Sequence, residues 1–144
     1  MLKAIIIDGS AVARGLLNTV LLDGGYDVVG QGHTCASATA LMVKYQPQIV
    51  CIARGQVEDD EEGLRALRRD WPKTVIFMVS SEFDASAIQW AHGMGVSGFI
   101  VKPFNADTVL KTIRNTVIAM VKRQQKALAA QNGAADGDGS GGEA

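Results

Sequence analysis

The chain has 144 residues, of which 47% are hydrophobic and 20% are charged, which is the composition of one ordinary globular domain. Its 14 lysines and arginines nearly balance 15 aspartates and glutamates, so the net charge of −1 offers no basic face for a nucleic acid. No apolar run reaches the roughly 18 residues that a membrane span requires. The two cysteines, Cys35 and Cys51, lack the spacing of a metal or redox motif. We therefore expect a reduced, cytoplasmic protein that binds neither nucleic acid nor membrane.

Five short apolar segments alternate along the chain with five segments of helical pattern. The predicted strands are Lys3–Asp8, Asp27–Gln31, Gln48–Ala53, Thr74–Ser80 and Gly98–Val101. The predicted helices are Ala11–Leu22, Ala36–Tyr45, Asp60–Trp71, Asp84–Met94 and Ala106–Gln131. Three of the strands are continuously apolar, which is typical of parallel strands covered by helices on both faces. The alternation predicts an α/β fold with a doubly wound, five-stranded parallel sheet.

The last predicted helix loses its apolar positions after Val121. We expect residues 1–121 to form the domain and residues 122–131 to form an extended helix end. Residues 132–144 read N-G-A-A-D-G-D-G-S-G-G-E-A and hold too little apolar surface to offset the entropy of ordering. They are predicted to be a disordered tail.

Four residues that end a predicted strand or directly follow one lie at the same edge of such a sheet. These residues are Asp8, Ala53, Ser80 and Lys102. Ligands of doubly wound sheets bind outside the carboxyl ends of the strands, where the strand order reverses. The candidate site is therefore expected at these four positions.

The segments around these strand ends resemble one family. They are I-I-I-D-G-S at 5–10, P-Q-I-V-C-I-A at 47–53, V-I-F-M-V-S-S at 75–81 and G-F-I-V-K-P-F at 98–104. From Lys3 to Ala119 the chain is similar to the receiver domain of bacterial two-component response regulators, the CheY-like superfamily. The resemblance implies a (βα)5, flavodoxin-like sheet of strand order 2-1-3-4-5. It also implies phosphoryl transfer from a histidine kinase to an aspartate.

Part of the family's site is present in this chain. Two acids at the end of the first strand and a third at the end of the third strand hold Mg²⁺ in the family, and the third acid is the phosphoacceptor. Asp8 matches the first of these acids. Ser80 and Lys102 match the hydroxyl and the ammonium that bind the phosphoryl oxygens, and Pro103 matches a proline that follows a cis peptide bond.

Two positions of that site lack a carboxylate. The second acid is replaced by Gly9 and the phosphoacceptor by Ala53. Asp8 alone should bind Mg²⁺ weakly, so we expect no resident cofactor and a vestigial metal site. Lys102 is expected to face Asp8, because at about 4 Å and an effective dielectric constant near 20 the two charges attract by about 4 kcal/mol before desolvation. We thus expect a stand-alone pseudo-receiver that is not an enzyme and acts by protein–protein interaction.

The resemblance also implies where partners bind. Receiver domains dock partners or dimerise through their fourth helix, fifth strand and fifth helix. In this chain that face would include Ile88, Gln89, Ala91, His92, Phe99, Lys102, Val109 and Arg114. Phe99 matches the aromatic switch residue of the family. The expected partners are a histidine kinase or a downstream effector, and the same face is a candidate homodimer interface.

Two alternatives to the pseudo-receiver remain open on the sequence. Asp59 or Asp60 is a candidate for an unconventional phosphoacceptor if the acidic stretch at 58–62 folds back over the strand ends. We predict that this stretch is instead a solvated loop that leads into the next helix. The other alternative is a sensor of a small anion bound by Lys102, Ser80 and N–H groups of the first helix.

Overall fold

A computed structural model describes residues 1–140 of the chain, with side chains through residue 131. The chain divides into two compact units, Met1–Ile113 and the part that begins at Arg114. The first unit holds the sheet and all the described helices except the C-terminal part of α6 (Ala106–Ser140). We expected the domain to extend to residue 121, and the division falls earlier along the same helix.

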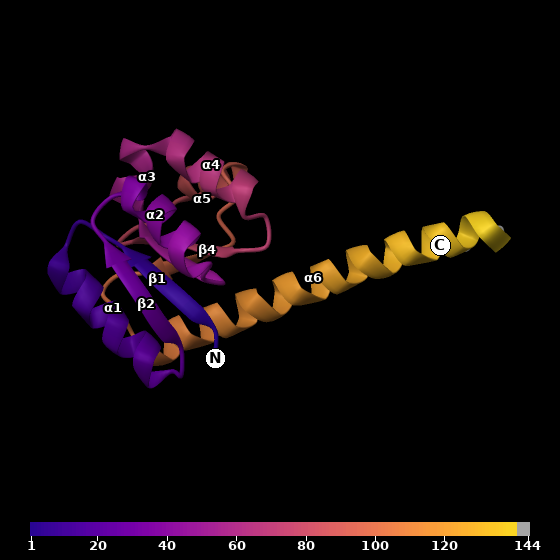
Figure 1. Cartoon of the computed structure of the whole chain (residues 1–144). Coiled ribbons are helices and arrows are strands. Elements are labelled where there is room, and N and C mark those ends of the chain that lie inside the picture. Colours follow the sequence, from indigo (N-terminus) through magenta and orange to yellow (C-terminus); the bar gives the residue numbers. More distant parts are fainter. Residues whose placement is uncertain (141–144) are drawn as a thin grey trace. The chain divides into compact units, whose positions relative to one another are not determined.

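Five strands form one parallel sheet with the order β2-β1-β3-β4-β5 (Figure 1). Their bounds are β1 (Lys3–Ile7), β2 (Asp27–Gly32), β3 (Ile49–Ala53), β4 (Val75–Ser80) and β5 (Gly98–Val101). The predicted α/β class and strand order are confirmed. Ile7 is paired with Ile52, so Asp8 and Ala53 lie at the same level on neighbouring strands, where the strand order reverses.

Within residues 1–140, six helices connect and follow the strands, one more than expected. Besides α6 they are α1 (Ala11–Asp23), α2 (Cys35–Tyr45), α3 (Arg54–Asp59), α4 (Glu61–Asp70) and α5 (Ala85–Gly93). A polar side chain accepts a hydrogen bond from a backbone N–H in the first turn of five of them, and these caps are Ser10, Thr34, Asp60, Asp84 and Asn105. Such caps satisfy donors that have no partner within the helix. The fourth and fifth predicted helices correspond to α5 and α6.

The structure corrects our prediction for the acidic stretch at 58–62 and for the residues that precede it. We expected a solvated acidic loop, whereas Arg54–Asp59 form helix α3 and Asp60 separates it from α4. Val57 anchors α3 because its side chain is fully buried in the core. Arg54 and Glu58 form an ion pair one turn apart, which further favours a helix.

The last helix also differs from its prediction. We expected it to end at Gln131 and residues 132–144 to be disordered, but α6 extends to Ser140. Adding a residue to an existing helix avoids the cost of nucleation, so weak helix formers are carried along. The part of the tail prediction that concerns residues 141–144 lies outside the described residues.

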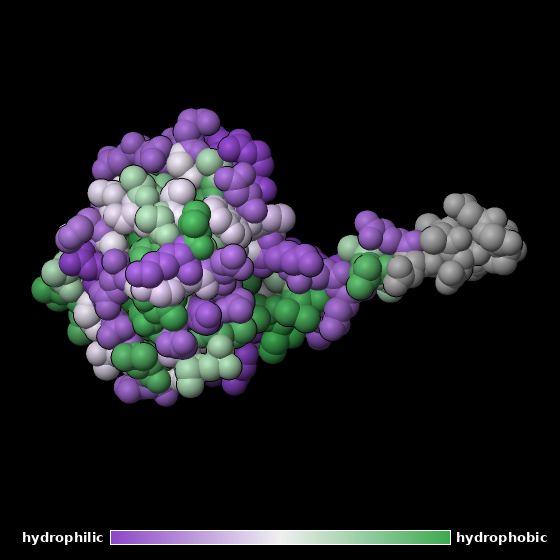
Figure 2. Space-filling view, viewed as in Figure 1, coloured by the Kyte–Doolittle hydropathy of each residue, from purple (hydrophilic) through white to green (hydrophobic). Residues whose placement is uncertain are grey.

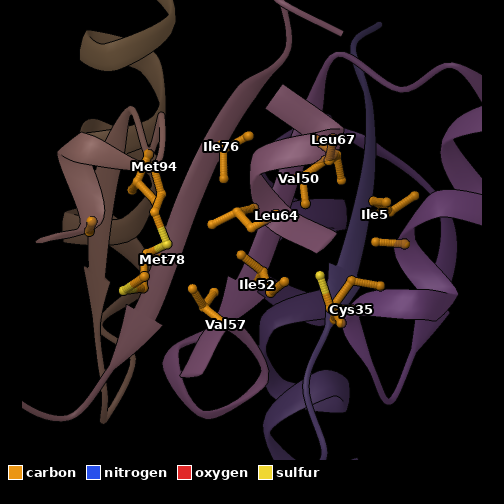
Figure 3. Packing of buried hydrophobic residues seen from close by; sticks show 14 of the residues in the cluster. Ile5, Cys35, Val50, Ile52, Val57, Leu64, Leu67, Ile76, Met78 and Met94 are labelled. Atoms are coloured by element: carbon orange, nitrogen blue, oxygen red, sulfur yellow. The ribbon is translucent and has the colours of Figure 1, made fainter. Parts of the chain in front are cut away.

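Alternating strand residues build a core on both faces of the sheet. Ile5, Val50, Ile52, Ile76 and Met78 pack in one buried cluster with residues from α2, α3, α4 and α5 (Figure 3). Ile6, Cys51 and Phe77 alternate with them and are at most 2% exposed, as are Leu17 and Leu21 of α1. Each large apolar side chain that is fully buried stabilises the fold by roughly 1.5–3 kcal/mol. The central strands are therefore held from both sides.

Arg68 ties together the edge of the sheet at which β4 and β5 begin. Its guanidinium donates two hydrogen bonds to the Gly95 carbonyl, at 3.0 and 2.7 Å, and further ones to the carbonyls of Trp71 and Pro72. It also donates to the Ser97 hydroxyl, which accepts from the Ile76 N–H of β4. Gly95 has a φ of 97°, and a Cβ there would lie 2.5 Å from the Arg68 stem. Burial lowers the pKa of Arg68.

Hydrophobic and hydrophilic residues are interspersed over the face of the molecule seen in Figure 2. Exposed large hydrophobic residues of the first unit include Val12 and Leu16 on α1 and Val101 on β5. Over the described part of the chain, no helix has the length and hydropathy to cross a membrane.

Candidate functional site

The carboxyl ends of β1 and β5 supply a close ion pair. Lys102 Nζ lies 2.9 Å from Asp8 Oδ2, with 31% and 9% of the two side chains exposed. The other carboxylate oxygen, Oδ1, accepts a 2.8 Å hydrogen bond from the Ser10 N–H. Both oxygens of Asp8 thus have partners, and the predicted contact between Lys102 and Asp8 is confirmed. The Lys102–Pro103 peptide bond is cis, as the resemblance implied.

Two small residues lie beside this pair. Ala53 ends β3 next to Asp8, is 8% exposed and makes no side-chain cap for α3. Gly9 follows Asp8, and a Cβ built there would lie 3.1 Å from Gln56 Nε2. The Gln56 amide therefore occupies the space in front of Gly9. A methyl group and a hydrogen atom provide neither a nucleophile nor a metal ligand.

The Ser80 hydroxyl forms hydrogen bonds with the backbone of its own turn. It donates to the Glu82 carbonyl at 3.0 Å and accepts from the Glu82 N–H at 3.3 Å. Such a local bond stabilises the turn that leads from β4 to α5. An incoming oxyanion would have to replace the Glu82 carbonyl as the partner of the Ser80 proton.

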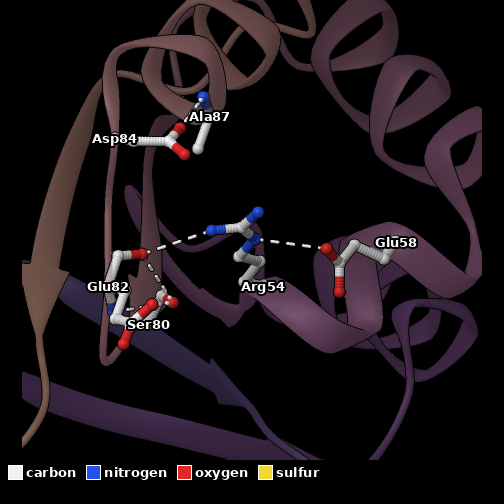
Figure 4. A network of polar contacts seen from close by, with 6 residues as sticks. All are labelled: Arg54, Glu58, Ser80, Glu82, Asp84 and Ala87. Atoms are coloured by element: carbon white, nitrogen blue, oxygen red, sulfur yellow. Dashed lines mark hydrogen bonds and ion pairs between the residues drawn. The ribbon is translucent and has the colours of Figure 1, made fainter.

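Arg54, which the sequence analysis did not identify as a site residue, connects α3 with the turn after β4 (Figure 4) and with α5. Its guanidinium donates to Glu58 Oε2 at 3.2 Å and to the Glu82 carbonyl at 3.2 Å. It also lies 5.8 Å from the centre of the Trp90 ring on α5, within the range of a cation–π contact. The i,i+4 spacing of Arg54 and Glu58 was a signal for the ion pair, but nothing in the sequence indicated the contact with Trp90.

Arg14 is a second residue that sequence reasoning missed. Its guanidinium donates to the backbone carbonyl of Asp8 and lies 3.2 Å from His33 Nδ1. Because an arginine carries no acceptor, His33 Nδ1 accepts in this contact. A second fixed cation therefore lies beside the ion pair.

Phe99 lies between two other aromatic rings on the predicted interaction face. Its ring is 4.8 Å from that of Phe83 and 5.3 Å from that of His92, both edge to face. A hollow of about 140 Å³ lies next to it, and Val101, Pro103 and Thr108 are among the residues that line it. Ile88 and His92 lie on α5 and Phe99 on β5 in the first unit, whereas Arg114 falls in the second unit.

The residues present do not fit a receiver-type magnesium site. Mg²⁺ needs several hard oxygen ligands in near-octahedral geometry. Asp8 supplies the single carboxylate, with one oxygen paired to Lys102, while Gly9 and Ala53 supply none. Among the residues that the structure describes, no three His, Cys, Asp or Glu side chains are grouped to hold a metal ion.

Comparison with known proteins supports the receiver fold. A family model described as the response regulator receiver domain matches residues 4–114. The chain belongs to the response regulator receiver family. This receiver is 28% identical to the chemotaxis protein CheY of Bacillus subtilis over 116 residues, which cover 80% of this chain and 97% of that protein.

Other receivers and larger proteins show the same similarity. A protein-glutamate methylesterase/protein-glutamine glutaminase of Halobacterium salinarum is 31% identical over 127 residues, covering 85% of this chain and 36% of that protein. The structure of the chemotaxis response regulator CheY4 of Vibrio cholerae matches with a TM-score of 0.72 at 27% identity, covering 81% of this chain and 98% of that chain. The receiver domain is thus a module of two-component signalling, in which it interacts with histidine kinases and effectors.

The acids considered as alternative acceptors lie at the C-terminal end of helix α3 of this receiver. Asp59 is the last residue of α3, six residues after Ala53, and α-helical rise separates the two by about 9 Å along the axis. Asp60 uses Oδ1 to accept from the Gly63 N–H as the cap of α4. Among the described residues, Lys102 pairs with Asp8 and Ser80 bonds to Glu82, and neither contacts the carboxylate of Asp59 or Asp60 through a hydrogen bond or ion pair.

Proposed function

We propose that the chain is a pseudo-receiver, a signalling module that acts through protein–protein contacts and is not phosphorylated at the usual position. The observation that carries the proposal is Ala53 at the end of β3, beside Asp8 and in the place of the phosphoacceptor. An alanine methyl group cannot attack a phosphoryl group. The module therefore has no acyl phosphate chemistry of its own and is not an enzyme.

The Asp8–Lys102 ion pair supports this proposal because it neutralises the remaining carboxylate without a metal. Lys102 Nζ at 2.9 Å takes the position of a cation on Asp8 Oδ2. Mg²⁺ would have to displace this ammonium, with a single carboxylate as its acidic ligand. We infer that Mg²⁺ binds weakly and that the pocket stays closed in its absence.

The face formed by α5, β5 and the start of α6 is the proposed docking surface. The hollow beside Phe99 offers a place for an apolar side chain, because its lining is neutral and includes Val101 and Pro103. A normal receiver reorganises this face when a phosphoryl group adds roughly two negative charges. Here a histidine kinase, a downstream effector or a second copy of the chain would select the state instead.

Intact-mass spectrometry after incubation with acetyl phosphate and Mg²⁺ tests the loss of chemistry. The wild type should keep its mass, whereas the Gly9→Asp/Ala53→Asp variant should gain one labile phosphoryl group. The Gly9 substitution is feasible because its contact at 3.1 Å is with the flexible end of Gln56. A phosphorylated wild type would contradict the proposal.

The same experiment separates the alternative acceptors. If the wild type gains a phosphoryl group that is lost in Asp59→Asn or in Asp60→Asn, the chain is a phosphorylatable response regulator with an unconventional acceptor. An increase in the melting temperature with sulfate or phosphate that requires Lys102 would instead favour the small-anion sensor.

A further inference from the structure

A surface depression lies between α3, the start of α4 and α5. It has a volume of about 370 Å³ and is lined by Arg54, Glu58, Glu61, Asp84 and Trp90, among others. These residues come from segments that are separated in the sequence. Arg54 pairs with Glu58 (Figure 4) and contacts Trp90 by a cation–π interaction, which connects α3 with α5 at the depression. Contacts within the first unit thus shape the depression, which is distinct from the hollow beside Phe99.

The charge of the lining is negative. One guanidinium, that of Arg54, faces three carboxylates, those of Glu58, Glu61 and Asp84, which leaves a net charge of −2. The carboxylate side chains of Glu58 and Glu61 are 52% and 40% exposed. They belong to a run of five consecutive acids at 58–62. An anionic ligand would be repelled here, whereas a cation is favoured.

The depression already binds one cation of the chain itself. The Arg54 guanidinium has a carboxylate oxygen at 3.2 Å, a backbone carbonyl at 3.2 Å and an indole ring at 5.8 Å. Carboxylate, carbonyl and aromatic face are the three kinds of partner that guanidinium groups prefer. The same lining therefore suits a second cationic side chain. The free carboxylate oxygen of Glu58 remains accessible for it, as does the second oxygen of Glu61, whose Oε1 pairs with Arg65 at 3.5 Å.

A long cationic side chain fits the depression better than a metal ion does. Its methylene stem covers apolar surface such as the Trp90 ring while its charged end meets the carboxylates. A metal ion would need several oxygens directed at one point, and Asp84 Oδ1 is already bonded to the Ala87 N–H. We propose that this depression binds a lysine or arginine side chain on a basic segment of a partner protein.

The proposal is independent of the missing phosphoacceptor, so it stands or falls separately from the pseudo-receiver assignment. Tryptophan fluorescence reports on it directly, because Trp71 and Trp90 are the two tryptophans of the chain. In a Trp71→Phe background, all indole emission comes from Trp90. The probe is an acetylated and amidated tetra-arginine peptide, and the matched control is a tetra-glutamate peptide.

We expect tetra-arginine to change the Trp90 emission saturably and tetra-glutamate to leave it unchanged. Glu58→Gln/Glu61→Gln should weaken tetra-arginine binding at least fivefold. Asp23→Asn/Asp27→Asn removes the same charge from an exposed surface formed by other elements and should weaken binding less than twofold. The single variant Glu61→Gln provides the same comparison, against Asp23→Asn, if the double variant is not folded in circular dichroism.

Three results overturn the proposal. The first is an unchanged Trp90 emission up to millimolar tetra-arginine. The second is an equal loss of affinity in the two double variants, which would mean non-specific attraction to a negative protein. The third is equal binding of tetra-glutamate.

Discussion

The strands begin at one edge of the sheet, the amino edge, and finish at the opposite one, the carboxyl edge. Each of these two edges holds a partly buried cation, but the partners of the two cations differ. At the amino edge, Arg68 donates to the backbone carbonyls of Gly95, Trp71 and Pro72 and so connects α4 with the turn before β5. At the carboxyl edge, Lys102 contacts the Asp8 carboxylate. The first cation satisfies the main chain of the fold, whereas the second neutralises the Asp8 carboxylate of the candidate site.

Under the proposed pseudo-receiver function, this difference would explain how the chain keeps a receiver fold without the receiver chemistry. The carboxyl edge carries Gly9 and Ala53 where the family has acids, and we propose that the ion pair there takes the place of a metal. Substitution of Arg68 at the amino edge would be less tolerated, because the backbone carbonyls that it binds would lose their hydrogen-bond donors. We therefore expect substitutions at the amino edge to change stability and those at the carboxyl edge to change binding and chemistry.

The largest effect is expected for Arg68→Ala at the amino edge. Removal of several hydrogen bonds from a charged donor to partly buried acceptors should lower the free energy of unfolding by about 2–3 kcal/mol. Urea denaturation followed by circular dichroism measures the loss. Arg69→Ala is the matched control, because that side chain is 73% exposed and pairs with Asp70 at 3.6 Å; its effect should stay below about 0.5 kcal/mol. Equal losses of unfolding free energy in the two variants would contradict the stabilising role of Arg68 at the amino edge.

A smaller effect is expected for Lys102→Ala at the carboxyl edge. The substitution leaves the buried Asp8 Oδ2 without its ammonium, and partial exposure of the lysine limits the cost to about 1–2 kcal/mol. The double variant Asp8→Ala/Lys102→Ala should lose less than the sum of the single losses, with a coupling of about 1 kcal/mol in the cycle. Strict additivity in the cycle would mean that the pair contributes nothing to closing the site.

Arg54→Ala should have a still smaller effect on stability. Its ion pair and cation–π contact are partly exposed, so we expect a loss of about 0.5–1 kcal/mol. In the Trp71→Phe background the emission of Trp90 should shift, because the guanidinium is removed from the ring. Arg65→Ala, which breaks ion pairs with Glu61 and Glu62 of the same kind, should leave that emission unchanged.

The smallest effect is expected for the reactivity of the two buried thiols, Cys35 and Cys51. Burial raises the pKa of Cys51 to about 12, and burial together with the Asp60 carboxylate raises that of Cys35 to about 11. Both remain protonated at pH 8, so native protein should resist iodoacetamide while denatured protein gains two adducts by intact mass. Reactivity should rise only as the pH approaches 11. Rapid labelling of one thiol at pH 8 would show that the core opens near that residue.

The sequence was sufficient to predict those features that depend on neighbouring residues along the chain. Continuous apolar runs predicted the central strands, and strand ends predicted the positions of Asp8, Ala53, Ser80 and Lys102, because parallel strands end at one edge. The partners of long side chains were not predictable, since Arg14, Arg54 and Gln56 meet their neighbours only in the folded chain. Helix α3 was missed because its six residues include a glycine and two acids, and the burial of Val57 that anchors it is a tertiary effect.

The melting temperature with and without 10 mM Mg²⁺ tests the central claim most directly, namely that the carboxyl edge is closed by a lysine in place of a metal. The wild type should shift by less than about 1 °C. Gly9→Asp/Ala53→Asp should be stabilised by several degrees, because an ion at about ten times its Kd adds about 1.4 kcal/mol. A wild-type shift equal to that of the variant would mean that Asp8 and its neighbours bind Mg²⁺ as an active receiver does, and would contradict the account.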